Sequence, residues 1–170
     1  LYGLTGTLEI GELGRRLVEA QAPPTLQLIT SVLIMAGFGY KIAAVPFHMW
    51  CPDVYEGSPT PVTAFFSVGP KAAGFAMLAR FLHEVFPPTV GGAAFEWKLV
   101  IALLAVLTMA VGNFGALHQQ NLKRMLAYSS IAHAGYLLVA FVAFTGDALA
   151  ALLFYLVIYV VMNLGAFLVV

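Results

Sequence analysis

Long apolar stretches dominate the chain after its first twenty residues. Five of them carry one lysine or no charge at all: 21–52 with Lys41, 57–79 with Lys71, and the charge-free stretches 99–122, 125–146 and 148–170. Each exceeds the roughly 20 residues that a helix needs to cross the hydrocarbon core of a bilayer. Runs such as 99–106 are apolar at every position, whereas the strands of a transmembrane barrel alternate apolar and polar residues. The pattern predicts an all-α protein, a polytopic bundle of five transmembrane helices.

The first 20 residues have a different pattern. They hold three glutamates and two arginines, with no compact apolar run before a cleavage site, so neither a signal peptide nor a membrane span is expected there. The chain begins without Met and stops inside an apolar run, and we expect it to be a piece of a longer polytopic protein. We therefore predict an extramembrane segment or loop over residues 1–20, followed by a five-span transmembrane bundle over residues 21–170.

Composition excludes most other classes of protein. Apolar residues make up 61% of the chain and charged residues only 9%, against about 25% charged residues in soluble proteins. Both a soluble globule and a disordered chain are therefore excluded. Eight basic and eight acidic residues cancel, so no basic field points to a nucleic-acid partner. A single cysteine, Cys51, excludes a disulfide framework and a cysteine-rich metal or iron–sulfur site.

Two of the five predicted spans contain a lysine deep in the apolar stretch. A lysine near the centre of a bilayer costs about 2.5–3.5 kcal/mol on insertion scales. Lys41 and Lys71 occupy successive spans, and none of the five stretches contains an acidic residue. A structural ion pair would therefore need a carboxylate from outside the chain. We favour a functional ion path that uses the two lysines.

A proline lies close to each lysine. Pro46 lacks an N–H and its ring clashes with the carbonyl of Ile42, so we predict a discontinuous helix that breaks near residues 42–46, with a short second half over 46–55. Pro70 directly precedes Lys71. Broken helices in membranes are tolerated where protein buries them or where they line a wet cavity, and in transporters they mark ion sites. A lysine at such a break is able to bind and release protons.

The fourth and fifth spans each carry a polar face. Five residues of the fourth span fall within about 140° at 100° per residue, namely Lys123, Ser129, Ser130, His133 and Tyr136. We expect the serines to form interhelical hydrogen bonds. His133 is either a proton relay or a structural group, and Lys123 either a relay or an interface charge. In the fifth span, Tyr155, Tyr159 and Asn163 recur at a spacing of four, which predicts an inward face.

The stretch between the first and second spans is rich in turn-forming residues. Residues 50–62 contain four of them: Pro52, Gly57, Pro59 and Pro61. We interpret this stretch as a loop, and its acids Asp53 and Glu56 as solvated turn or cap residues. His48 directly follows the predicted break and is a candidate for a wet cavity.

Two long motifs then resemble a known family. Residues 41–75, KIAAVPFHMWCPDVYEGSPTPVTAFFSVGPKAAGF, and residues 121–138, NLKRMLAYSSIAHAGYLL, resemble the antiporter-like membrane subunits of respiratory complex I. The segment PFHMWCPDVYEGSPTPV is similar to the N-type subunit of that family, and to subunit 2 of the related photosynthetic complex. The resemblance covers roughly residues 26–170, and residues 1–20 match nothing recognisable.

The resemblance implies a fold, an activity and a set of site residues. The family folds as inverted five-helix repeats, each with a discontinuous helix, and the chain resembles most of the second repeat. Five residues occupy the positions of the family's proton relay: Lys41, Lys71, Lys123, His133 and His48. The implied function is proton translocation in NADH:quinone oxidoreductase. A subunit of a multisubunit cation/proton antiporter is the alternative, and a purely structural helix bundle is a third possibility.

The same resemblance implies where the redox chemistry lies. We expect no cofactor in this chain, because flavin, iron–sulfur clusters and quinone belong to other subunits of the complex. The expected partners are other membrane subunits and the lipid bilayer, with no nucleic acid. The expected location is a bacterial inner membrane, with the thylakoid or mitochondrial inner membrane as alternatives.

Overall fold

The computed structural model describes residues 2–20, 23–85 and 97–170, and all regular structure in these ranges is helical. In chain order the described helices are α1 (Tyr2–Thr5), α2 (Ile10–Glu19), α3 (Pro24–Ile42), α4 (Trp50–Gly57), α5 (Thr60–Val85), α6 (Trp97–Leu117), α7 (Leu122–Ala143) and α8 (Gly146–Val169). The prediction of an all-α polytopic membrane bundle is confirmed.

Four of these helices are long and apolar enough to cross a membrane, namely α5, α6, α7 and α8. They correspond to the second to fifth predicted spans. The first predicted span is divided between α3, whose apolar part covers Leu28–Ile42, and the short helix α4. The five predicted spans therefore correspond to one discontinuous helix, α3 with α4, and four continuous helices.

The predicted break in the first span is confirmed. Helix α3 ends at Ile42, and Ala43 has a left-handed backbone with φ 59° and ψ 42°. The N–H of Ala44 donates to the carbonyl of Gly39 at 2.8 Å, which is the pattern of a Schellman cap that satisfies the last carbonyls of a helix. The Val45–Pro46 peptide bond is cis. The second half-helix begins at Trp50, four residues later than the expected start at residue 46.

The prediction that residues 50–62 form a loop is wrong. Residues 50–57 form α4, and α5 begins at Thr60. Proline is tolerated in the first turn of a helix, where the backbone N–H has no helical partner. Pro52 and Pro61 both lie in first turns, so these prolines mark the starts of two helices. Helix α5 also continues without interruption through Pro70.

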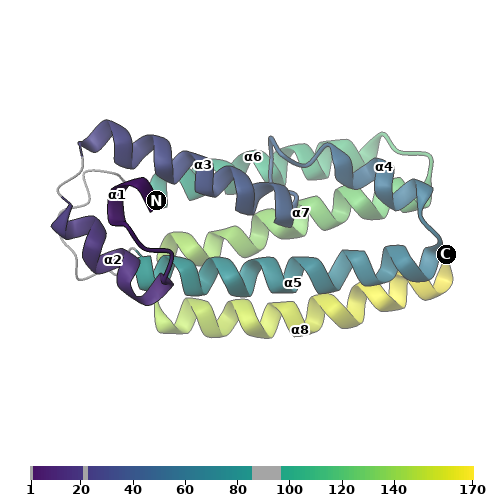
Figure 1. The fold of residues 1–170 in the computed structure, drawn as a ribbon. Coiled ribbons are helices and arrows are strands. Elements are labelled where there is room, and N and C mark those ends of the chain that lie inside the picture. The colour runs from purple at the N-terminus through teal and green to yellow at the C-terminus, as the bar shows by residue number, and fades with distance from the viewer. Residues whose placement is uncertain (1, 21–22, 86–96) are drawn as a thin grey trace.

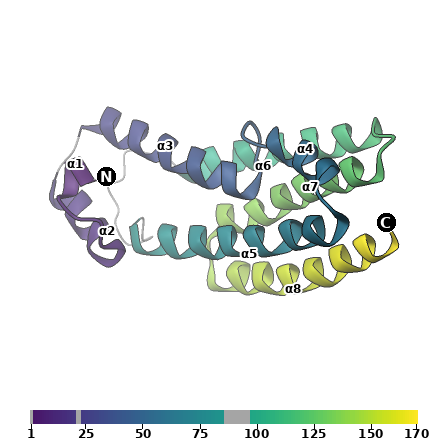
Figure 2. The ribbon, with the colours of Figure 1, turned by 45° about the vertical axis from the view of Figure 1, so that its right-hand side comes forward.

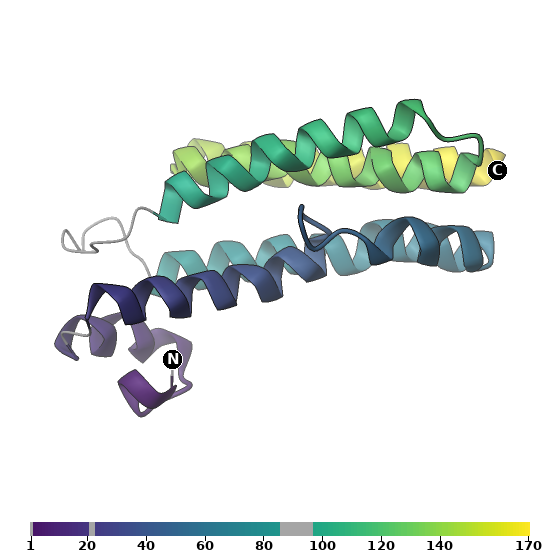
Figure 3. The same cartoon turned by 90° about the horizontal axis from the view of Figure 1, so that it is seen from above.

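The long helices run back and forth along one bundle (Figure 1). Helices α5 and α8 lie side by side, and α6 packs closely on α7 in the layer that Figure 3 separates from α3 and α5. The α6–α7 contact is close because Gly112 faces α7: a Cβ atom at this position would lie 2.5 Å from the backbone nitrogen of Ala132. Small residues that allow two backbones to approach are typical of helix pairs in membranes.

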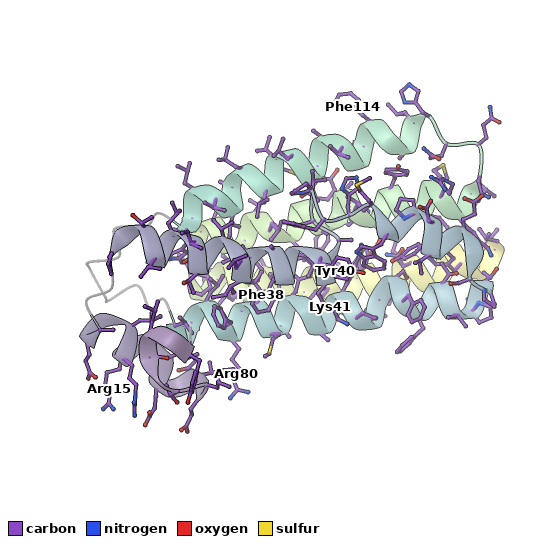
Figure 4. The ribbon with its side chains drawn as sticks, turned by 45° about the horizontal axis from the view of Figure 1, so that its top comes forward. Arg15, Phe38, Tyr40, Lys41, Arg80 and Phe114 are labelled. Atoms are coloured by element: carbon purple, nitrogen blue, oxygen red, sulfur yellow. The ribbon has the colours of Figure 1, made fainter. Side chains whose placement is uncertain are left out.

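The short helices α1 and α2 lie at one end of the bundle, beside the start of α3 and the end of α5 (Figure 2). Leu13 of α2 packs against Phe81 and Val85 of α5. The opposite face of α2 carries charges, and Arg15 points away from the bundle in Figure 4. Helix α2 is thus amphipathic and covers the end of the bundle. That residues 1–20 lie outside the membrane stays a prediction.

Candidate functional site: a lysine and hydroxyl cluster inside the bundle

Lys71 lies in the interior of the bundle with only 2% of its surface exposed. Helix α5 places it there because its buried face repeats every three to four residues through Thr63, Ser67, Lys71 and Gly74. The ammonium nitrogen donates to the backbone carbonyl of Ser130 at 2.7 Å and also to the Ser130 hydroxyl. Within the described ranges no carboxylate forms an ion pair with this lysine. Its hydrogen-bond partners in the bundle are therefore neutral.

The Ser130 hydroxyl is the centre of this cluster. Its oxygen lies 2.6 Å from the Tyr159 hydroxyl and 3.4 Å from the Tyr55 hydroxyl. The Tyr159 hydroxyl also donates to the carbonyl of Ser67 at 3.4 Å. Ser130, Tyr159 and Tyr55 are all buried. The cluster therefore joins α4, α5, α7 and α8 through hydroxyl groups that meet at Ser130, which binds the ammonium.

Sequence reasoning identified Lys71 but missed the importance of its partners. We expected Ser130 to form interhelical hydrogen bonds, and it does, but nothing in the sequence paired it with Lys71, 59 residues earlier. The inward face predicted for the fifth span is confirmed, because Tyr159 and Asn163 are buried. The spacing of four between the two tyrosines of α8 was the available signal for Tyr159.

His133 lies beside the cluster, one turn along α7 from Ser130. Its Nδ1 atom is hydrogen-bonded to the Tyr155 hydroxyl, and its ring centroid lies 5.3 Å from that of Tyr159. Tyr136, on the same predicted polar stripe, instead bonds to Asn113 of α6. Residues of the polar stripe on α7 therefore bind two different helices, His133 binding α8 and Tyr136 binding α6. His133 contacts the Lys71 cluster through the Tyr159 ring.

Lys41 and His48 flank the break between α3 and α4. Lys41 occupies the last turn of α3 and is exposed in this chain, lying beside α5 in Figure 4. Its aliphatic stem passes Gly74, one turn after Lys71 on α5. His48 is partly buried, and within the described residues its Nδ1 atom is buried without a hydrogen-bond partner. The structure therefore puts both residues at the break and outside the Lys71 cluster.

Lys123 lies at the end of the bundle where α7 begins. Its ammonium nitrogen donates to the carbonyl of Ser58 at 2.9 Å, directly after α4. The next residue, Arg124, contacts Asp53 at 2.7 Å and Glu56 at 2.8 Å through a single guanidinium nitrogen. The interpretation of these two acids as solvated is confirmed, because their side chains are exposed. They lie in helix α4 and not in a turn, however, and they bind the first turn of α7.

The groups of the cluster are suited to binding protons rather than a metal ion. A lysine amine and hydroxyl groups in hydrogen-bond contact are able to hold a proton and to rearrange around it. Within residues 2–20, 23–85 and 97–170, no group of three or more histidine, cysteine, aspartate and glutamate side chains is placed to hold a metal ion. The arrangement therefore favours proton handling.

Comparison with known proteins identifies relatives of the whole chain. The family model described as "NADH:quinone oxidoreductase/Mrp antiporter, TM" matches residues 1–170, so residues 1–20, which resembled nothing recognisable, belong to the same family match. The NADH-quinone oxidoreductase subunit N 2 of Sorangium cellulosum is 52% identical over 179 residues, covering 100% of this chain and 35% of the relative. The NAD(P)H-quinone oxidoreductase subunit 2 of a Synechococcus strain is 52% identical over 173 residues, covering 99% of this chain and 31% of its own length. The chain thus spans about a third of the length of these relatives.

Solved structures of membrane complexes share the fold. Respiratory complex I from Thermus thermophilus matches with a TM-score of 0.75 and 42% identity, over 98% of this chain and 33% of the matched chain. An archaeal membrane-bound sulfane sulfur reductase matches with a TM-score of 0.83 and 29% identity, over 98% of this chain and 33% of the matched chain. The family model matches every residue of the chain, and the first relative is 52% identical in sequence. The chain therefore belongs to the NADH:quinone oxidoreductase/Mrp antiporter transmembrane family.

Proposed function

We propose that the chain is part of the proton-translocating N-type membrane subunit of an NADH:quinone oxidoreductase, and that Lys71 is its central proton-carrying residue. The relatives that support this assignment are named as subunits of NADH-quinone oxidoreductase. Because the chain covers about a third of their length, the activity belongs to the assembled complex.

The burial of Lys71 among neutral partners carries the proposal. A charged group inside a membrane span is costly, and such residues mark ion and proton pathways. The ammonium donates hydrogen bonds to a carbonyl and a hydroxyl group and has no carboxylate among its described partners, so nothing in this chain fixes its charge permanently. Lys71 therefore binds a proton in one state of the complex and releases it in another.

The other candidate residues extend the path on both sides of Lys71. Lys41 and His48 at the helix break form one side of the relay, and His133 and Lys123 on α7 form the other. Histidine suits this role because it binds and releases protons near neutral pH and has two distinct ring nitrogens. The sites joined by the relay are separated in this chain, so water or residues of neighbouring subunits complete it.

The redox chemistry takes place outside this chain. Flavin, iron–sulfur clusters and quinone belong to other subunits of the complex, and proton movement here is driven by quinone reduction there. The partners are other membrane subunits and the surrounding lipid. The membrane is the bacterial inner membrane, as the bacterial origin of the relatives indicates.

A subunit of a multisubunit cation/proton antiporter is the second candidate. The observation that favours it is the similarity to the Mrp complex from Dietzia sp., with a TM-score of 0.79 and 25% identity over 98% of this chain. The higher identity of the complex I relatives, 52% for the first of them, favours the oxidoreductase.

Reconstitution of the complex distinguishes the two functions. The complex is purified through an affinity tag on this chain, placed in proteoliposomes, and supplied either with NADH and quinone or with a sodium gradient alone. We expect NADH to drive proton movement and flavin and iron–sulfur subunits to copurify. Sodium/proton exchange without NADH would instead support the antiporter, and wild-type activity after Lys41 and Lys71 are both replaced by Met would support a structural bundle.

A further inference from the structure

The geometry points to Tyr159 as a positioning residue for Lys71: through Ser130, its hydroxyl supplies whichever hydrogen bond the protonation state of the lysine requires. This inference rests on the proposed function of Lys71. It assigns a role to α8, whose apolar sequence contains Asp147 in its first turn and no other acidic or basic residue.

The contacts of Ser130 define what its hydroxyl must do. A serine hydroxyl has one proton to donate and two lone pairs that accept, whereas a lysine ammonium only donates. When Lys71 is charged, the Ser130 oxygen accepts from it, and the serine proton must go to another acceptor. The Tyr159 hydroxyl at 2.6 Å is closer than the Tyr55 hydroxyl at 3.4 Å. Tyr159 is therefore the main acceptor for Ser130 in the charged state.

Tyr159 is able to accept this bond because its own proton has another partner. The Tyr159 hydroxyl lies 3.4 Å from the carbonyl of Ser67 on α5, which accepts the phenol proton. In the charged state the donors run from Lys71 to Ser130, from Ser130 to Tyr159, and from Tyr159 to the Ser67 carbonyl. Every hydroxyl proton in this chain of groups has an acceptor.

Loss of the proton from Lys71 reverses the hydrogen bonds between Lys71 and Ser130 and between Ser130 and Tyr159, and the Tyr159 hydroxyl then turns away from the Ser67 carbonyl. A neutral amine has a lone pair, so Ser130 is then able to donate to Lys71 and to accept from Tyr159. The hydroxyl groups only rotate, no covalent bond breaks, and Tyr159 keeps its proton in both states. The Tyr159 phenol thus accepts from Ser130 when the lysine is charged and donates to Ser130 when the lysine is neutral, which a phenylalanine ring cannot do.

Three features of Tyr159 and its surroundings suit this residue to the role. It is 2% exposed, so within the bundle its hydroxyl depends on Ser130 and Ser67 for partners. The hydroxyl of Tyr155, one turn earlier on α8, is committed to His133. The Tyr159 ring also packs against His133, so the residue that responds to Lys71 also contacts the candidate relay residue on α7.

The test removes each hydroxyl separately and together in the assembled membrane complex. The variants are Tyr159→Phe, Ser130→Ala and the double variant, and NADH-driven proton pumping per assembled complex is measured across a range of pH. A buried hydrogen bond has a net value of a few-fold to about tenfold in an equilibrium, so we expect Tyr159→Phe to lower pumping about three- to tenfold and to change its pH profile. The double variant should equal Ser130→Ala alone, because Tyr159 acts through Ser130.

Matched variants separate this role from a structural one. Ser129→Ala removes the neighbouring hydroxyl on α7, and Tyr40→Phe removes the hydroxyl of an exposed tyrosine on α3; both should keep the wild-type pH profile. The inference is overturned if Tyr159→Phe has the wild-type rate and profile, if it lowers only the amount of assembled complex, or if its effect adds to that of Ser130→Ala. Lys71→Ala is the parallel arm: if it pumps normally, the proposed function fails, whereas if it stops pumping and Tyr159→Phe does not, only the role of Tyr159 fails.

Discussion

At the scale of single residues, the cost of burying Lys71 is reduced by neutral acceptors. The carbonyl of Ser130 accepts from the ammonium at 2.7 Å, and the hydroxyl of the same residue is a second acceptor. A carbonyl oxygen has two lone pairs, so it is able to accept this bond while it also accepts a helical hydrogen bond within α7. A carboxylate would hold the charge more strongly, so neutral acceptors suit the proposed exchange of the proton on Lys71.

Thr108 has a comparable role at the helix break and leads to a stability prediction. Its hydroxyl accepts from the N–H of Val45 at 3.0 Å and bonds to the carbonyl of Leu104. Thr108→Val keeps the shape of the side chain but leaves the Val45 N–H without a partner in the apolar interior. We expect the free energy of unfolding to fall by about 1–3 kcal/mol.

Denaturation of the purified protein in detergent, followed by circular dichroism, measures this loss. Thr108→Ser is the control, because it retains the hydroxyl. If the valine variant were as stable as the wild type, the hydrogen bond between Thr108 and Val45 would not stabilise the chain at the helix break.

The candidate site was only partly predictable at this scale. The depth of Lys71 in an apolar stretch is visible in the sequence, because charge and hydropathy are local properties. Ser130 as its partner is not visible, because the contact depends on how α5 packs on α7. Thr108 gave no signal either, since one threonine in a predicted span is commonplace. Helix packing also decides why Lys71 is buried and Lys41 is exposed, although both lysines lie in apolar stretches of the sequence.

At the scale of elements, the half-helix α4 is held by the first turn of α7. Asn121 caps α7 and also donates to Glu56 at 3.0 Å. Arg124 binds Asp53 and Glu56, and Lys123 binds the carbonyl of Ser58. One side of α4 thus faces a row of donors. This contact fixes the orientation of the half-helix that carries Tyr55 into the Lys71 cluster.

Removing the guanidinium should therefore loosen α4. In Arg124→Gln we expect faster amide hydrogen exchange over residues 50–57, measured by mass spectrometry, and an unchanged rate over α8. Because the ion pairs are exposed, high salt should bring the wild type closer to the variant.

Arg80→Gln provides the control, since Arg80 is an exposed residue of α5. Equal exchange over residues 50–57 in wild type and Arg124→Gln would show that packing alone holds α4.

The elements were more predictable than their contacts. The break after Ile42 follows from the sterics of Pro46, and the four long spans follow from uninterrupted apolar stretches. Helix α4 was misjudged because proline and glycine indicate both loops and helix starts. Only the positions of Pro52 and Pro61 within first turns distinguish the two, and the sequence does not reveal where the turns begin.

At the scale of the whole molecule, the described helices surround the ammonium of Lys71 and leave Lys41, another candidate relay residue, at the surface. Lys71 lies where α5, α7 and α8 meet, whereas Lys41 is exposed at the end of α3. This arrangement suits a chain that forms one part of a larger membrane assembly, in which the proton path enters and leaves through neighbouring segments. In the proposed function, the interior lysine carries protons that the assembly pumps.

The most direct test is the number of protons pumped per electron in proteoliposomes that contain the complex with Lys71→Ala. Lys98→Ala is the matched control, because Lys98 lies in the first turn of α6 and its ammonium lies over the Trp97 ring. We expect Lys71→Ala to lower the ratio while the redox subunits remain able to oxidise NADH, and Lys98→Ala to pump normally. A fully assembled Lys71→Ala complex with the wild-type ratio would contradict the proposed function.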